Sequence, residues 1–160
     1  MDKNVRLKIL FEINEIDIQL DMYKNLLTDT KNRVPDIVET SAIAAVIHSF
    51  YNGIEKTFEI IAKKLDKFIP TSGRTHQELL NHVCMKNDAR PAIIDEEAYK
   101  ILKDYMDFRH FFRHGYLIHL DWERMKDLSY NIFDAWKTVK KQLLNFADFL
   151  ENNDLNKTGE

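Results

Sequence analysis

Apolar residues recur every three or four positions along most of the chain, which is the spacing of one face of an α-helix. No segment of useful length alternates apolar and polar residues as a half-buried strand does. The apolar face of the first predicted helix consists of Ile9, Ile13, Ile16, Leu20, Tyr23 and Leu27. A second helix is predicted from about Asp36 to Lys67, and its apolar face consists of Ile43, Ile47, Phe50, Ile54, Phe58, Ile61 and Leu65. The boundary between the two helices is expected near Pro35, because proline disfavours a helical conformation in the residue before it.

The segment FIPTSGRT breaks the helical pattern with Pro70 and Gly73. A short third helix, HQELLNHVCM, is expected after it, and Thr75 and Glu78 have the spacing of a capping box at its start. Pro91 then ends the helical pattern in the polar segment that follows.

Asp95 is the expected N-cap of a fourth helix that ends near Gly115, and Asp121 is the expected N-cap of a fifth. The apolar face of the fourth helix consists of Ala98, Leu102, Tyr105, Phe108 and Phe112. That of the fifth consists of Leu128, Ile132, Ala135, Val139, Leu143, Phe146 and Leu150. The pattern predicts an all-α protein, an antiparallel bundle of four main helices plus one short helix.

Length and composition narrow the class of protein. We expect a single domain over residues 1–153 and a loose polar tail at 154–160. The formal net charge of -3 means that binding of nucleic acid must depend on a local basic patch. The longest apolar run, AIAAVI, is too short to span a membrane, and the N-terminal residues lack the apolar core of a signal peptide. A single cysteine, Cys84, excludes an internal disulfide. We therefore expect a cytoplasmic protein without membrane association.

The segment FRHFFRHGY, residues 108–116, combines two arginines and two histidines with four aromatic residues. The helix macrodipole favours cations near a helix C-terminus, but this explains only one or two of these residues. Arginine binds phosphate oxygens bidentately, and histidine transfers protons near neutral pH. Together they suffice to cleave RNA without a metal: histidine takes the proton of the ribose 2′-hydroxyl, and arginine stabilises the charge that builds on the phosphate. The alternative is a structural or anion-binding helix end.

The geometry of a straight helix separates the two residues best suited to this chemistry. Arg109 and His114 lie about 140° apart around the helix and about 7.5 Å along it. They therefore do not share a face, although their side chains are long enough to flank one phosphate. Either the last helical turn is distorted before Gly115, or a second subunit completes the cleft. We favour the second explanation, because a symmetric dimer brings two copies of the segment together.

The second helix carries a polar stripe beside its apolar face, formed by His48, Asn52, Glu55 and Glu59. One interpretation is a solvated helix surface. The other is that Asn52 and Glu55, next to the helix-weakening Gly53, approach the fourth helix and orient Arg109 or Arg113.

The histidines do not make a convincing metal site. His110 and His114 have the spacing of a zinc-binding pair, but two histidines without an H-E-x-x-H motif are a weak signal. His76 and His82, on the short third helix, are expected to be surface or packing residues. We therefore predict neither a metal nor another cofactor.

The pattern R-x-x-x-x-H-x-Y, formed by Arg109, His114 and Tyr116, resembles the signature of HEPN-domain proteins, and specifically of HepT-like ribonuclease toxins. The resemblance extends over approximately residues 5–150 and includes the segments FYNGIEKTFEIIAKKLD, HQELLNHV and FRHFFRHGYLIHLDWERM. It implies an all-helical HEPN-like domain that forms a homodimer, in which the motifs of both chains line a shared cleft.

The resemblance also implies a function, that of the toxin in a toxin–antitoxin pair. Such a toxin is a metal-independent endoribonuclease that acts on RNA, and Arg109 and His114 are its implied catalytic residues. Its implied partner is a nucleotidyltransferase antitoxin that transfers AMP to the motif tyrosine, here Tyr116. AMP adds bulk and negative charge where an RNA phosphate must bind. The modification would therefore block RNA binding and neutralise the toxin.

Arg113, Asn52 and Glu55 are the expected supporting residues of this site, and a role for His110 stays open. The alternative function is that of a non-catalytic helical protein, which binds a nucleotide or RNA or acts as a scaffold for a nucleotidyltransferase.

Overall fold

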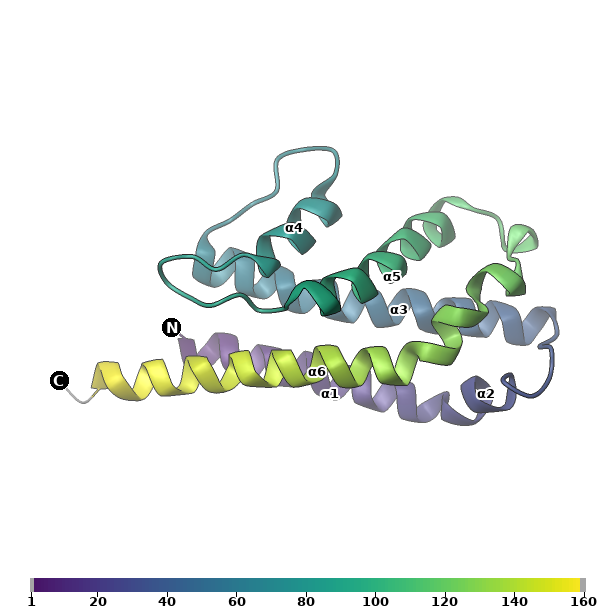
Figure 1. Cartoon of the computed structure of the whole chain (residues 1–160), viewed down its shortest axis with the longest axis horizontal. Helices are drawn as coiled ribbons and strands as arrows, with labels where there is room; N and C mark the ends of the chain where they lie inside the picture. The colour runs from purple at the N-terminus through teal and green to yellow at the C-terminus, as the bar shows by residue number, and fades with distance from the viewer. Residues whose placement is uncertain (1, 159–160) are drawn as a thin grey trace.

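The computed structural model of the chain describes residues 2–158 (Figure 1). Within these residues no strand is formed, and the helices are α1 (Asp2–Met22), α2 (Lys24–Asp29), α3 (Ile37–Ile61), α4 (Thr75–Cys84), α5 (Glu96–His114) and α6 (Trp122–Thr158). A π-helical turn, Ala62–Asp66, extends α3, and a 3-10 turn, Leu117–His119, lies between α5 and α6. The prediction of an all-α fold is confirmed.

The four long helices α1, α3, α5 and α6 run alternately in opposite directions, as Figure 1 shows, and form the predicted antiparallel bundle. Helices α1 and α6 lie side by side, and α3 packs against both of them. The short α4 contacts α3 and α5. This arrangement brings α3, α4 and α5 together on one side of the bundle.

The predicted apolar faces form the core, with one exception. Nearly all of their residues are buried, and Leu65, Phe108, Phe112 and Leu128 are half-buried against the same cluster. Tyr23 was predicted to join them but is 39% exposed. The first helix is interrupted at this residue, where φ is -101° and ψ is 5°, and the chain restarts as α2. The change in direction turns Tyr23 outward while Leu20 and Leu27 stay buried.

The predicted helix starts are correct at α5 and wrong at α4. Asp95 caps α5 by accepting a hydrogen bond from the backbone N–H of Ala98 at 2.9 Å. No capping box forms at α4, because the helix already begins at Thr75 and its hydroxyl is therefore not at the N-cap position. The Glu78 carboxylate instead accepts a hydrogen bond from the backbone N–H of Thr71 at 3.2 Å.

A close approach between α1 and α3 explains the glycine in the middle of α3. A Cβ atom on Gly53 would lie 2.9 Å from Cγ1 of the buried Ile16. Glycine therefore allows α1 to pack closely beside Asn52, and this packing offsets the weaker helix propensity of glycine.

A buried ionic cluster fixes the segment between α4 and α5. Arg90 donates hydrogen bonds from Nε and Nη2 to the Asp66 carboxylate at 2.7–3.0 Å, and Nε2 of His82 lies 2.7 Å from the same carboxylate. The His82 ring also stacks on Phe68, with the ring centroids 3.9 Å apart. His82 is thus a packing residue, as the sequence indicated.

The C-terminal helix is longer than the apolar pattern indicates. The predicted loose tail at 154–160 overlaps the end of α6, which continues to Thr158, and residues 159–160 lie outside the described part of the chain. None of the described helices combines the length and the apolar character needed to cross a membrane.

Candidate active site

Side chains from three helices hold the guanidinium of Arg109, which lies on α5. Its Nε donates a hydrogen bond to Oδ1 of Asn52 on α3 at 2.6 Å, and its Nη1 lies 3.1 Å from Nε2 of His76 on α4. Its Nη2 lies 3.7 Å from Oε1 of Glu55, also on α3, in an ion pair. The Arg109 side chain is only 12% exposed. The contacts therefore keep one cation in a defined position at the junction of α3, α4 and α5.

Glu55 supplies the negative charge of this site. Its side chain is 7% exposed, and burial of a carboxylate is costly unless partners compensate it. Oε2 lies 2.7 Å from Nδ1 of His76, while Oε1 faces Arg109. The polar stripe of α3 is therefore not a solvated surface at this point, and its carboxylate is matched by partners on two other helices.

The direction of the hydrogen bonds follows from arginine, which can only donate. Since Arg109 Nε–H points at Oδ1 of Asn52, the amide Nδ2 of Asn52 donates to Nε2 of His48 at 3.0 Å. His48 is then neutral and carries its proton on Nδ1. Burial lowers the pKa of His48, and the positive charges of Arg109 and Arg113 lower it further. Hydrogen-bond direction and electrostatics thus agree on a neutral imidazole.

The end of α5 presents the remaining candidate residues to solvent. Arg113, His114 and Tyr116 are exposed, and Tyr116 reaches 78% exposure. The ring of His114 lies 4.8 Å from that of His110, measured between centroids. Within the described residues, no hydrogen bond or ion pair joins His114 to Arg109. One chain therefore brings together Arg109, Asn52 and Glu55, whereas His114 and Tyr116 form no hydrogen bond or ion pair with them in the part of the chain that the structure describes. Arg113 acts only through its charge near His48.

His76 is the member of this site that sequence reasoning missed, since it was expected only at the surface or in packing. The apolar pattern places His76 on a short helix but does not predict which face of this helix packs against α3. A polar stripe with a carboxylate in the middle of a long helix was the available signal, because such a group needs a partner once it is buried.

Metal ligands are not gathered in the described part of the chain, where no three His, Cys, Asp or Glu side chains are grouped to hold an ion.

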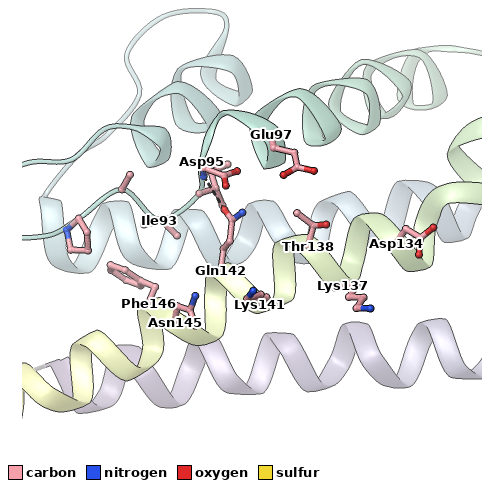
Figure 2. Close-up of a pocket in the computed structure, with 13 residues that line it drawn as sticks. Ile93, Asp95, Glu97, Asp134, Lys137, Thr138, Lys141, Gln142, Asn145 and Phe146 are labelled. Atoms are coloured by element: carbon pink, nitrogen blue, oxygen red, sulfur yellow. Dashed lines mark hydrogen bonds between the residues drawn. The ribbon is translucent and has the colours of Figure 1, made fainter.

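Two surface grooves help to locate the candidate site within the fold. A groove of about 300 Å³ between α1 and α3 includes Asn52 and Phe11 in its lining. An open pocket of about 860 Å³ lies elsewhere, between the segment before α5 and the side of α6 (Figure 2). None of the candidate site residues lines this larger pocket.

A double-mutant cycle tests the contact between Arg109 and Asn52. We predict that Arg109→Ala and Asn52→Ala have a coupling energy of about 1–3 kcal/mol, because the hydrogen bond involves a charged donor. The measurement is urea unfolding of the two single variants, the double variant and the unchanged chain, followed by circular dichroism. Additive effects within experimental error would contradict the contact.

Comparison with known proteins identifies the family. A family model described as HepT-like protein matches residues 42–150, which include most of α3, all of α4 and α5, and α6 as far as Leu150. Comparisons with curated proteins and with solved structures gave no match. The matched region contains Asn52, Glu55, His76, Arg109 and His114 and covers more than half of the chain. The chain belongs to the HepT-like family.

Proposed function

We propose that the chain is a metal-independent endoribonuclease and the toxin of a toxin–antitoxin pair. The observation that carries the proposal is the guanidinium of Arg109, nearly buried, hydrogen-bonded to Asn52 and paired with Glu55 in a member of the HepT-like family. A preorganised cation stabilises charge that develops in a transition state without reorganising during the reaction. Such a group suits the cleavage of a phosphodiester.

The proposed reaction begins at the ribose 2′-hydroxyl. His114 takes its proton, and the 2′ oxygen attacks the adjacent phosphorus while Arg109 donates hydrogen bonds to the non-bridging phosphate oxygens. The bond from phosphorus to the 5′ oxygen breaks, and this oxygen takes the proton that His114 accepted from the 2′-hydroxyl. The products are a 2′,3′-cyclic phosphate and a free 5′-hydroxyl. Arg113 supports the site with a second positive charge one helical turn after Arg109.

A homodimer resolves the separation of Arg109 and His114. Helix α5 continues without interruption to His114, so a distorted last turn does not bring the two side chains together. In a symmetric dimer, His114 of one protomer can approach Arg109 of its partner. A row of exposed apolar residues offers a surface for this association: Leu7, Phe11, Ile18 and Met22 on α1. Phe11 lines the same groove as Asn52, which connects this surface to the site.

Replacement of His114 tests the catalytic assignment. We predict that His114→Ala lowers the rate of RNA cleavage by about 10²- to 10⁴-fold, because the reaction loses its general base. The fold and the dimer should be unchanged, because His114 is exposed. The measurement is cleavage of single-stranded RNA in the presence of EDTA, with circular dichroism and size-exclusion chromatography as checks. His119→Ala, which removes another exposed histidine, is the control expected to cleave normally. Undiminished cleavage by His114→Ala would overturn its role.

The exposed Tyr116 provides the proposed point of regulation, through a nucleotidyltransferase antitoxin. The Tyr116 hydroxyl oxygen would attack the α-phosphorus of ATP, so that an O–P bond to AMP forms and pyrophosphate leaves. At 78% exposure, the phenol is accessible to a second enzyme. The AMP phosphate would add negative charge beside His114 and repel RNA.

Mass spectrometry combined with an RNA cleavage assay tests this switch. After co-expression with a nucleotidyltransferase encoded by a neighbouring gene, we predict that the chain gains the mass of one AMP and no longer cleaves RNA. Tyr116→Phe should gain no mass and should cleave RNA whether or not the transferase is present. Modification at another residue, or cleavage that persists after modification, would contradict the proposed regulation.

A further inference from the structure

We propose that His76, oriented by Glu55, is a positioning residue that sets the plane of the Arg109 guanidinium. The inference rests on the proposed function, in which the position of Arg109 matters for RNA cleavage. It assigns a role to a side chain outside the Arg109–His114–Tyr116 pattern and on a different helix.

The hydrogen-bond directions define what His76 does. Arg109 Nη1 can only donate, so Nε2 of His76 accepts this bond through its lone pair. The imidazole proton is then on Nδ1, where it is donated to Oε2 of Glu55 at 2.7 Å. Glu55 therefore selects the tautomer and the ring orientation that His76 needs to hold Arg109.

A second hydrogen bond is necessary to define the guanidinium plane. The bond from Nε to Asn52 holds one corner, and the group can still rotate about this contact. Glu55 Oε1 attracts Nη2 from 3.7 Å, which is too far for a hydrogen bond and so fixes no orientation. The bond from Nη1 to His76 supplies the second fixed point. Loss of this bond would leave Arg109 near the site but with its donors misdirected.

The surroundings of His76 allow this role to be separated from folding. Its side chain is 39% exposed, so shortening it leaves no buried cavity, and Glu55, which loses its bond to His76, keeps its ion pair with Arg109. Helix α4 has independent attachments to α5, since Gln77 Nε2 donates to the Tyr99 hydroxyl at 2.9 Å and Lys103 Nζ donates to Gln77 Oε1 at 3.3 Å. The helix is therefore expected to remain docked when His76 is replaced.

Three variants of the full chain test the proposal. His76→Ala removes both hydrogen bonds, whereas His76→Gln keeps a side chain that can donate to Glu55 and accept from Arg109. Gln77→Ala is the matched control, because it weakens the attachment of α4 to α5 and touches neither Glu55 nor Arg109. The measurements are kcat and KM for cleavage of single-stranded RNA, and the NMR cross-peak of the Arg109 Nε–Hε group.

For His76→Ala we expect kcat to fall by about 10- to 100-fold with little change in KM, because Arg109 acts mainly on the transition state. The Arg109 cross-peak should shift or broaden. His76→Gln should restore most of the kcat and the original position of the Arg109 cross-peak. Gln77→Ala should have the same kcat and the same cross-peak position as the unchanged chain.

Two results would overturn the role of His76: an unchanged Arg109 signal and kcat in His76→Ala, or equal losses in His76→Ala and Gln77→Ala. The NMR measurement does not depend on catalysis. If the unchanged chain cleaves no RNA, the proposed function fails, while the Arg109 signal still decides whether His76 positions this side chain.

Discussion

The carboxylate of Glu55 is buried in the middle of a long helix, and such a group is tolerated only where cations or hydrogen-bond donors compensate it. Arg109 and His76 provide this compensation from α5 and α4. The same constraint that joins three helices therefore also fixes a guanidinium at their junction. Asn52 adds a directed hydrogen bond, and His48 completes the chain as a neutral acceptor. One set of contacts therefore compensates a buried carboxylate and also fixes the position of a cation.

The bundle divides the segment from Arg109 to Tyr116 into a buried part and an accessible part. Arg109 is held within the packed helices, and Gly53 lets α1 support the α3 segment that carries its partners. His114 and Tyr116 lie at the exposed end of α5, where a second protomer, an RNA strand or a modifying enzyme can reach them. Under the proposed function, this division gives the catalytic cation a fixed position and leaves the proposed base and modification site accessible.

Most of the fold was predictable because burial imposes a helical period on the sequence, as Ile43, Ile47 and Ile54 illustrate. The two wrong predictions depend on local backbone geometry, which the apolar pattern does not specify. Tyr23 turns outward at a break in the helix, and Thr75 is one position past the N-cap of α4. At the site, spacing within α3 and α5 suggested that Asn52 and Glu55 meet Arg109, and the contacts are present. His76 was missed because its role depends on how α4 docks, a tertiary property that no local pattern encodes.

In the proposed dimer, Arg109 of one protomer works with His114 of its partner. This pairing is tested most directly by mixing two inactive variants, Arg109→Ala and His114→Ala, after allowing the protomers to exchange. A shared cleft predicts that each mixed dimer contains one intact pair, so activity returns to about one quarter of that of the unchanged protein when dimers form at random. If native mass spectrometry shows mixed dimers and the mixture remains as inactive as either variant alone, the shared cleft is contradicted.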